Sequence, residues 1–568
     1  MSNQTSTSQQ MKSFLSGKTY LLLIIIIFNG LLVQQTFAQP TITSFTPADG
    51  PVGTEVTITG THFSSIAANN IVYFGAVKST VIAATATTLK VNVPTGTTYQ
   101  PITVTTKGLT AYSSKPFLVT FASVAGPFTD SSFSANIDFE TGISPLDNHL
   151  SDFNGDGKPD VIVSDYNAPT VTILKNLSTN GNVTFDSVVN LKTSGNATTC
   201  FIGDFDGDGK QDVGATGYFT NSISVFRNQS SVGNISFGSK TDFATSVGPS
   251  YSAIGDLDKD GKPDIVITAR GSERISILRN TSTTANISFA SKLDFTIGAN
   301  SEPFACAMGD LDGDGKVDII VGNRGVGYIS LFRNTSTPGH ISLASRVDIN
   351  ISEDKTPNGI SIGDLNGDGE PDIVVAGFGN NFAPAWISIL QNKSIIGSLL
   401  FEKHIDFFTG GAGCHSASIT DLDGDGKPDL VTDNYWDGIL SVLKNTSTSG
   451  HLSFDKPVFL KANSGPNHPQ ISDLDGDQKP DIEVANIFSH SVSAFRNLIK
   501  FKRSSLVSSF TLVNANTDKD IQAIPDGSVL DKTALPPLNI RANTTATKVG
   551  SVVFILDGQK VRTENGFP

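Results

Sequence analysis

The sequence Asp310-Leu-Asp-Gly-Asp-Gly-Lys-Val-Asp318 places carboxylates at positions 1, 3, 5 and 9 of a short turn. Gly315 can take the left-handed backbone conformation that brings these side chains toward one point. Because Ca²⁺ is bound by six to eight oxygens at about 2.3–2.6 Å, acidic side chains at alternate positions of a tight loop suit it. The stretch therefore predicts a calcium-binding loop.

Six further copies of this stretch begin at Asp152, Asp204, Asp256, Asp364, Asp421 and Asp473. Successive copies start 52 to 57 residues apart, and a repeat of about that length is typical of a solenoid or a β-propeller. An EF-hand is the main alternative, but it needs a glutamate at position 12 and helices on both sides. Position 12 is Val321 in the fourth copy, and β-branched residues flank the copies, which predicts loops between two strands.

In these copies the chain resembles the FG-GAP/VCBS repeats of the integrin α-subunit propeller, in which Asp-x-[Asp/Asn]-x-Asp-Gly-x-x-Asp binds Ca²⁺. The resemblance implies about seven structural Ca²⁺ ions, each held by side chains at positions 1, 3, 5 and 9 and by the backbone carbonyl of position 7. The implied ligands are Asp152, Asn154, Asp156, Lys158 and Asp160; Asp204, Asp206, Asp208, Lys210 and Asp212; Asp256, Asp258, Asp260, Lys262 and Asp264; Asp310, Asp312, Asp314, Lys316 and Asp318; Asp364, Asn366, Asp368, Glu370 and Asp372; Asp421, Asp423, Asp425, Lys427 and Asp429; and Asp473, Asp475, Asp477, Lys479 and Asp481. Gln478 replaces the turn glycine of the last loop, so we expect the weakest site there.

Each repeat reads as four short strands, the content of one propeller blade. In the fourth repeat we expect them at Phe304–Met308, Asp318–Val321, Tyr328–Arg333 and Leu343–Ile349. Strands of the fourth type are expected to begin at Phe133, Phe185, Phe237, Phe289, Leu343, Phe401 and Phe454. The first of these precedes the first loop, so Phe133–Phe139 is expected to complete the last blade and to close a seven-bladed ring over residues 133–499.

Residues 40–121 form a separate module with alternating apolar positions at Val56 and Ile58 and further strands at Ile71–Phe74, Leu89–Val93 and Ile102–Thr106. The stretch ITSFTPADGPVGTEVTITGTHF, followed by VYFG, resembles the IPT/TIG family of immunoglobulin-like sandwiches, which implies a spacer or interaction module without chemistry. The predicted fold is all-β: this sandwich, the propeller, and a partial β-sandwich module over residues 506–568. No clear final strand is evident in that last region, so we expect it to be truncated.

Residues 1–38 are interpreted as a signal peptide, because Lys12 and Lys18 precede an apolar run from Tyr20 to Val33. A membrane anchor is the alternative, but the run is shorter than the roughly 20 residues that span a bilayer. We therefore expect a secreted or bacterial cell-surface protein, monomeric and without a stable membrane span in the mature chain. Cys200, Cys306 and Cys414 are expected to be buried free thiols, because equivalent positions in separated blades do not meet.

The formal net charge of −14 argues against nucleic acid as a partner. The turns opposite the metal loops carry aromatic residues that could stack on sugars or anchor a protein. The candidate ligand-binding cluster is Phe378, Phe382, Trp386, Tyr435 and Trp436, and the alternative is that these rings only pack between blades. His149, His415 and His468 precede three of the loops without a ligand motif and are expected to be satisfied polar residues.

No catalytic motif for acyl transfer, metalloproteolysis or phosphate binding occurs in the chain. We therefore expect a calcium-binding protein that acts in adhesion, or in binding an extracellular glycan or protein, and not an enzyme. The alternatives are a polysaccharide lyase or hydrolase, or an accessory domain of one, and a structural surface scaffold.

Overall fold

The computed structural model describes residues 38–122, 126–351, 355–379 and 384–500, and beyond residue 500 only Thr517 and five strands. The predicted signal peptide falls almost entirely on residues 1–37, outside the described residues. No helix of the described part is long and apolar enough to cross a membrane. Its regular structure is β, apart from two single 3₁₀ turns, η1 (Ala67–Asn69) and η2 (Arg270–Ser272).

The IPT/TIG-like module is a sandwich of two four-stranded sheets, ordered β1-β3-β7-β6 and β5-β4-β8-β9. Inward-facing residues such as Val56, Ile58, Val72 and Phe117 form its core. Its strands are β1 (Thr41–Thr46), β2 (Asp49–Gly50), β3 (Glu55–Thr61), β4 (Asn70–Phe74), β5 (Val77–Ser79), β6 (Val81–Ala84), β7 (Thr88–Asn92), β8 (Pro101–Thr106), β9 (Leu109–Pro116) and β10 (Leu118–Val119).

Seven further four-stranded antiparallel sheets follow in the described part of the chain. Six consist of consecutive strands: β12 (Pro145–Ser151), β13 (Asp160–Asp165), β14 (Thr170–Asn176) and β15 (Phe185–Lys192); β16 (Ala197–Gly203), β17 (Asp212–Gly217), β18 (Ser222–Phe226) and β19 (Thr241–Ala244); β20 (Pro249–Gly255), β21 (Asp264–Ala269), β22 (Arg274–Leu278) and β23 (Leu293–Thr296); β24 (Pro303–Gly309), β25 (Asp318–Asn323), β26 (Tyr328–Phe332) and β27 (Val347–Asn350); β28 (Lys355–Gly363), β29 (Asp372–Gly379), β30 (Pro384–Leu390) and β31 (Ile405–Ala412); β32 (Ala417–Thr420), β33 (Asp429–Asn434), β34 (Ile439–Leu443) and β35 (Val458–Lys461).

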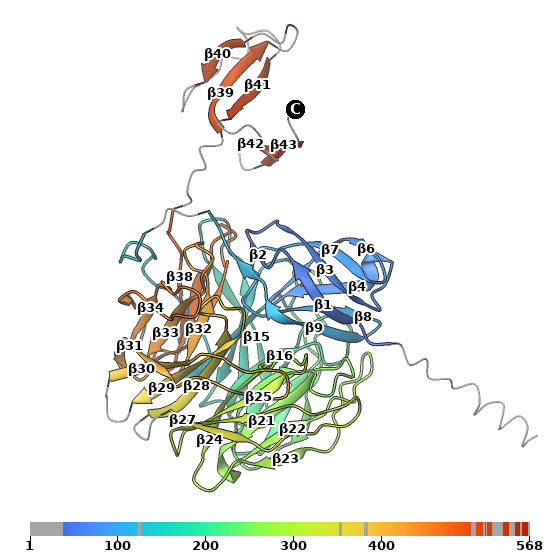
Figure 1. Cartoon of the computed structure of the whole chain (residues 1–568), viewed down its shortest axis with the longest axis vertical. Helices are drawn as coiled ribbons and strands as arrows, with labels where there is room; N and C mark the ends of the chain where they lie inside the picture. Colours follow the sequence, from blue (N-terminus) through green and yellow to red (C-terminus); the bar gives the residue numbers. More distant parts are fainter. Residues whose placement is uncertain are drawn as a thin grey trace, which may run out of the picture.

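The seventh sheet joins the two ends of the repeat region. It combines β11 (Ile137–Glu140) with β36 (Pro466–Ser472), β37 (Asp481–Asn486) and β38 (Ser491–Phe495), and β11 pairs antiparallel with β38. The predicted completion of the last blade by the strand before the first loop is confirmed. The first strand of each sheet contacts the first strand of the next, and β36 contacts β12, so the sheets form a closed ring (Figure 1).

The second strand of each sheet is buried along its whole length or nearly so, because neighbouring sheets cover both of its faces. In β21, for example, all six residues from Asp264 to Ala269 are buried. The sequences of such strands are nearly continuous apolar runs. The hydrophobic clusters of the ring lie between adjacent sheets. Each second strand begins with the position-9 aspartate of a loop, so the rigid interior of the ring positions the loops.

Most outer strands begin later than predicted. In the fourth sheet the outer strand β27 starts at Val347, whereas Leu343 forms only an isolated bridge to Asn334. Phe237, Phe289, Phe401 and Phe454 form the same kind of bridge. The physical reason is visible at Phe289, whose ring packs edge-on against Phe205 of the preceding sheet, 5.7 Å between centroids. These residues anchor one sheet to the next before the outer strand begins.

Beyond residue 500, β39 (Val507–Asn514) pairs with β40 (Asp520–Ile524) and β41 (Leu538–Thr544), and β42 (Ser551–Leu556) pairs with β43 (Gln559–Asn565). The expectation that this region lacks a clear final strand is wrong, because β43 forms an antiparallel hairpin with β42. Val561 is the one apolar residue in the sequence Gln559–Asn565, so a search for apolar periodicity does not find this strand.

Candidate functional site: the metal loops and the opposite rim

Each predicted metal loop connects the first and second strands of a sheet, and backbone N–H groups hold its carboxylates inward. In the fourth loop the two oxygens of Asp310 accept hydrogen bonds from the backbone of Gly313 and Gly315, both at 2.9 Å. Asp318 accepts one from Leu311 at 3.1 Å and one from Asn334 at 2.8 Å. These backbone hydrogen bonds therefore fix the shape of the loop.

In at least four of the loops the acidic side chains converge as the spacing predicts. In the second, third, fourth and sixth loops, oxygens from three carboxylates lie within 4.8 Å of one another. Burial, with a contribution from neighbouring carboxylates, raises the pKa of Asp204 and Asp256 to about 7 and that of Asp264 to about 8. Asp204 Oδ1 is buried without a hydrogen-bond partner among the described residues. An all-oxygen, acidic and partly desolvated donor set of this kind fits Ca²⁺.

A basic side chain from the third strand reaches the loop in most sheets, and the sequence analysis did not anticipate it. In the fourth sheet Arg333 donates from Nε to Asp312 at 2.6 Å and from a terminal nitrogen to Asp314 at 2.8 Å. The equivalent residues are Arg227, Arg279, Lys444 and Arg496, and each of them lies directly before an asparagine that recurs in every copy of the repeat. In the fifth sheet Gln391 takes this position, and Lys393, directly after the asparagine, pairs with Asp368 instead. The basic residue before the asparagine was the available signal.

Two loops depart from the glycine pattern. Gln478 takes a left-handed φ of +71° at the position where the fourth loop has Gly315 at +79°. Lys259 takes a φ of +56° at position 4 of the third loop, a departure that the sequence analysis did not single out. A left-handed conformation costs a residue with a Cβ roughly 1–2 kcal/mol. Both loops nevertheless keep the same shape, so these two residues hold a strained backbone conformation.

The asparagine of each repeat ties adjacent sheets together. Asn334 donates from Nδ2 to Leu257 O in the preceding sheet at 2.9 Å and to Val317 O at 2.9 Å, and its Oδ1 accepts from Ser336. The same link to the preceding loop, at 2.7–3.0 Å, is made by Asn176, Asn228, Asn280, Asn392, Asn445 and Asn497. The bond from Asn176 to Leu474 O closes the ring. These amides are 0–1% exposed, so they serve the fold as internal links.

The IPT/TIG-like sandwich packs directly onto the metal loops. Tyr73 donates to Gly209 O at 3.0 Å, Gln39 donates to Asp256 at 2.8 Å, and the backbone of Thr110 donates to Gly261 O at 2.7 Å. Further contacts join Ala76 O to the first loop, Lys115 to Gly369 O in the fifth and Phe121 to Gly424 in the sixth. The module was expected to be a spacer or interaction module, and in the structure it contacts the metal loops directly.

Glycines at position 6 of two loops permit this close approach. A Cβ on Gly209 would lie 2.1 Å from a methyl carbon of Ile71, and a Cβ on Gly261 would lie 2.9 Å from Leu109. A cavity of about 560 Å³ remains between the sandwich and the first strands of the ring. It is lined by Tyr112 on one side and by His149, Ile254 and Met308 on the other.

The opposite rim carries an aromatic cluster built by the turns after the second strands. Phe378 lies 6.3 Å from Tyr435 and 6.0 Å from Trp436, and Tyr435 lies 4.8 Å from Trp436, all between ring centroids. Phe488 of the seventh sheet joins it, 5.2 Å from Tyr435. Trp436 is 41% exposed and Phe488 is 52% exposed. The cluster is therefore partly exposed to solvent.

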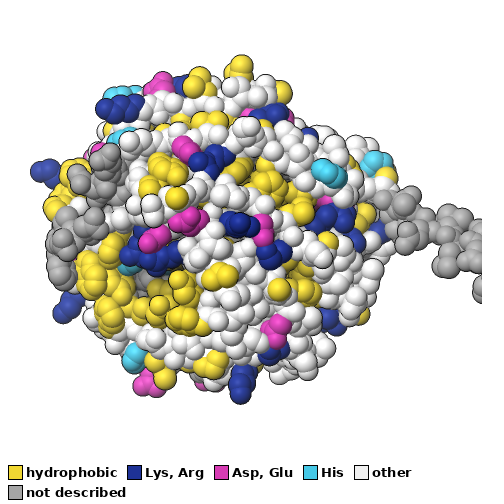
Figure 2. Space-filling view, turned by 90° about the horizontal axis from the view of Figure 1, so that it is seen from below, with side chains coloured by type: hydrophobic (Ala, Val, Ile, Leu, Met, Phe, Trp, Pro, Cys, Tyr) yellow, Lys and Arg dark blue, Asp and Glu magenta, His cyan; other side chains and the backbone are white. Residues whose placement is uncertain are grey.

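One predicted member of this cluster, Trp386, lies elsewhere. Trp386 packs against Phe408 on the neighbouring outer strand, 5.2 Å between ring centroids, and no ring contact joins it to Trp436 among the described residues. Phe382 lies outside the described residues. His415 and Arg324 belong with the rim: His415 lies 4.6 Å from both Phe378 and Tyr435, and the guanidinium of Arg324 lies 5.7 Å from the Phe378 centroid. In Figure 2 acidic and basic side chains are interspersed on the visible face, and hydrophobic ones gather in patches.

The three histidines that precede loops have different surroundings. His149 and His468 each face Asp147, with nitrogen–oxygen distances of 3.5 Å, and His468 Nε2 lies 2.6 Å from the Tyr251 hydroxyl. Burial alone would raise the pKa of Asp147, but the two imidazoles outweigh this effect, so the pKa lies below its usual value. His415 is buried, and its Nδ1 has no partner among the described residues, so for this nitrogen the expectation of a satisfied polar group is wrong.

All three cysteines are free, and Cys200 and Cys414 are buried as expected. Cys306 is only partly buried, which corrects the expectation for this residue. Cys306 stands four residues before its loop, as Cys200 does. In the sheet before Cys306, the small Ala253 occupies the position that His149 occupies in the sheet before Cys200.

The comparisons with known proteins agree with this geometry. The family model for FG-GAP-like repeats matches residues 152–215, 207–267, 256–321, 310–375 and 421–484, which together make up half of the chain. The chain belongs to the FG-GAP-like repeat family. The IPT/TIG domain model matches residues 40–121 of this FG-GAP-like repeat protein. Together the FG-GAP-like repeats and the IPT/TIG domain suggest an extracellular binding or scaffold role.

No curated protein matches the FG-GAP-like repeat chain. Solved structures similar to it include a Bacteroides thetaiotaomicron protein of unknown function, with 13% identity, 81% of this chain and 98% of that chain covered, and a TM-score of 0.31. An auxiliary nutrient binding protein from Bacteroides ovatus shows 13% identity over 81% and 99% of the two chains, with a TM-score of 0.33. The periplasmic gluconolactonase of Pseudomonas aeruginosa shows 12% identity over 65% and 96%, with a TM-score of 0.39.

Proposed function

We propose that this protein is a secreted or cell-surface calcium-binding protein that binds an extracellular glycan or protein through the rim opposite the metal loops. The observation that carries the proposal is the aromatic cluster of Phe378, Tyr435, Trp436 and Phe488, in which Trp436 and Phe488 are exposed to solvent and Phe378 and Tyr435 are half-buried. Exposed aromatic rings stack on sugar faces and act as anchors in protein interfaces. The proposal includes no catalytic step.

The charge around the cluster supports a polar ligand. Arg324 lies over the rings of Phe304 and Phe378, and Arg270 forms an ion pair with Glu302 at 2.6 Å. His415 Nδ1 has no hydrogen-bond partner in the described chain and lies beside the cluster. A site that combines apolar ring faces with a few polar groups is typical of carbohydrate and peptide recognition.

In this proposal Ca²⁺ has a structural role. The ions neutralise the acidic loops, and the loops support both the ring and the IPT/TIG domain on the face that the ligand does not use. Because the loops lie at the far ends of the second strands from the aromatic cluster, the ions would not touch the ligand. Calcium should therefore affect binding only through the stability of the ring.

The test is a glycan array and an extracellular-protein array probed with the full chain in Ca²⁺, with Trp436→Ala and Trp386→Ala as matched variants. Each variant removes one partly exposed tryptophan, but only Trp436 belongs to the aromatic cluster. We expect a ligand that Trp436→Ala loses and Trp386→Ala keeps. Equal loss in both variants, or turnover of a polysaccharide by the wild-type chain, would contradict the proposal.

A further inference from the structure

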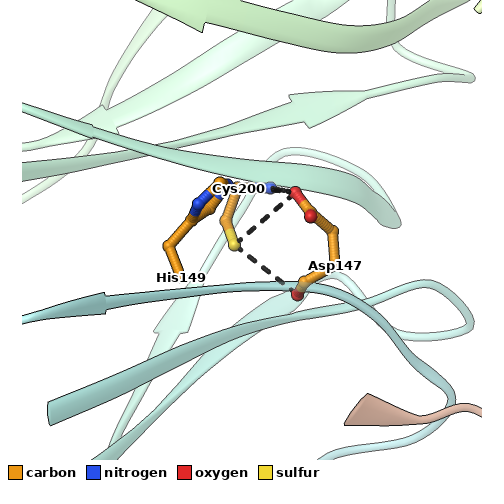
Figure 3. Close-up of side chains that lie close together, drawn as sticks. All are labelled: Asp147, His149 and Cys200. Carbon is orange, nitrogen blue, oxygen red and sulfur yellow. Dashed lines mark hydrogen bonds and ion pairs between the residues drawn. The ribbon is translucent and has the colours of Figure 1, made fainter. Parts of the chain in front are cut away.

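Three different metal-donor groups meet between the first strands of two neighbouring sheets. Asp147 and His149 stand two residues apart on β12, and Cys200 lies on β16 of the next sheet. One donor atom from each residue lies within 4.8 Å of the other two. Figure 3 shows the three side chains converging between the strands. The set combines one oxygen, one nitrogen and one sulfur, unlike the all-oxygen loops.

The distances within this cluster suit coordination better than direct pairing. His149 Nε2 lies 3.5 Å from Asp147 Oδ2, and Cys200 Sγ lies 4.0 Å from the same oxygen. A charge-assisted N–H···O bond is usually about 2.7–2.9 Å long. Around a tetrahedral Zn²⁺ ion, the bond lengths of nitrogen, oxygen and sulfur ligands place neighbouring donors about 3.4–3.6 Å apart. The nitrogen–oxygen separation matches such an edge, and the sulfur–oxygen separation is somewhat longer; Cys200 Sγ also lies 3.6 Å from the backbone oxygen of Asp147.

We propose that Asp147, His149 and Cys200 form a binding site for Zn²⁺, separate from the carboxylate loops. Mixed imidazole, thiolate and carboxylate donors suit Zn²⁺, whereas Ca²⁺ prefers oxygen alone. Binding replaces the proton of the Cys200 thiol, which passes to solvent as the sulfur–metal bond forms. Three protein ligands leave a fourth coordination position for water.

The surroundings of the cluster orient its ligands. The backbone N–H of Cys200 donates to Asp147 Oδ2 at 3.1 Å, which fixes the carboxylate between the two strands. The other oxygen of Asp147 faces His468 Nδ1 at 3.5 Å, and Tyr251 fixes His468 from the far side. Partners of this kind around metal ligands typically contribute about 10–100-fold in affinity.

Access and burial are also consistent with a metal site. Asp147 is 2% exposed and Cys200 is 1% exposed, so any charge on them is largely removed from water. His149 lines the cavity between the IPT/TIG domain and the ring, which gives an ion a route to the cluster. A cation held there would offset the cost of burying the carboxylate and the thiolate.

The chain contains a matched control for this site. Cys306 stands four residues before its loop, as Cys200 does. In the sheet before Cys306, however, Tyr251 replaces Asp147 and Ala253 replaces His149. The sulfur of Cys306 contacts backbone groups, among them Val266 O at 4.0 Å. Cys306 therefore has the same place in the fold without the carboxylate and the imidazole.

The experiment is a Co²⁺ titration of the full chain in saturating Ca²⁺, followed by absorption. We expect a thiolate-to-Co²⁺ charge-transfer band that saturates at one ion per chain and disappears when Zn²⁺ is added. Cys200→Ser should abolish the band, Cys306→Ser should leave it unchanged, and His149→Ala should weaken Co²⁺ binding at least about tenfold. Thermal unfolding of each variant in Ca²⁺ shows whether it is folded.

If Cys200→Ser does not fold, His149→Ala carries the test, because this side chain borders the cavity and lies outside the hydrophobic clusters. A wild-type chain without the band would overturn the proposal and leave Asp147 and His149 as an ion pair. Loss of the band in Cys306→Ser, or wild-type affinity in folded His149→Ala, would also overturn it.

Discussion

The two ends of the propeller are formed by the same seven sheets, but one end is closed and the other is open. On the metal-loop face, backbone N–H groups, basic side chains and Gln39 beside the IPT/TIG domain donate hydrogen bonds to acidic side chains of the loops. On the opposite rim Trp436 and Phe488 remain 41% and 52% exposed, beside a buried nitrogen of His415 that has no partner among the described residues. From this difference we infer that the metal-loop face would contribute mainly to stability and that the open rim would be available for the proposed binding.

The largest effect is expected at the asparagine links under the metal-loop face. Asn334→Ala would leave two carbonyls and one N–H group without their bonds in a fully buried place. We expect a loss of about 3 kcal/mol in the free energy of unfolding, measured by denaturant titration in Ca²⁺. Asn350→Ala, on an exposed outer strand, is the control. Equal effects in both variants would show that the links do not carry the stability of this face.

The docking of the IPT/TIG domain is tested by Tyr73→Phe. This change removes the hydroxyl bond to Gly209 O from a side chain that is 6% exposed. We expect a loss of about 1–2 kcal/mol and faster hydrogen exchange in the second loop. Tyr166→Phe on the opposite rim, where the tyrosine is 38% exposed, should change neither. An unchanged exchange rate in Tyr73→Phe would contradict the close docking of the two domains.

The strain in the last loop predicts a gain of stability. Gln478→Gly should relieve the left-handed φ of +71° and stabilise the chain in Ca²⁺ by about 1 kcal/mol. The reverse change in the fourth loop, Gly315→Gln, should destabilise by a similar amount. Thermal unfolding at one fixed Ca²⁺ concentration measures both. A destabilising Gln478→Gly would mean that the glutamine side chain supports this loop in a way that strain alone does not describe.

The smallest effect on stability is expected on the open rim. Trp436→Ala should change the free energy of unfolding by less than about 1 kcal/mol, because the side chain is partly exposed. A much larger loss would show that the aromatic cluster packs for stability, and the contrast between the two ends would fail.

The repeating features of the fold were predictable because each is local. The spacing of aspartates and glycines within nine residues specifies the loops, and the apolar runs after them specify the second strands. The later start of β27 was not predictable, because it depends on the bridge between Asn334 and Leu343 and on packing against the neighbouring sheet.

Contacts between distant segments account for what the sequence analysis missed. No common sequence pattern links Gln39, Tyr73 and Thr110. The fold of the sandwich brings them to the metal loops. The donor cluster joins Asp147 and His149 to Cys200, 51 residues later in the chain. Aligning the repeats by their loops would place these residues on facing strands, so part of that signal was present. The separation of Trp386 from the aromatic cluster depends on its pairing with Phe408, which no local pattern indicates.

The most direct test of the central claim, that seven calcium-filled loops stabilise the ring, is calorimetry of the full chain with Ca²⁺ and with excess chelator. At a tenfold excess over the dissociation constant, each site should add about 1.4 kcal/mol. We expect a rise of many degrees in the unfolding temperature and a titration that ends near seven ions per chain. An unfolding temperature that Ca²⁺ leaves unchanged would contradict the account.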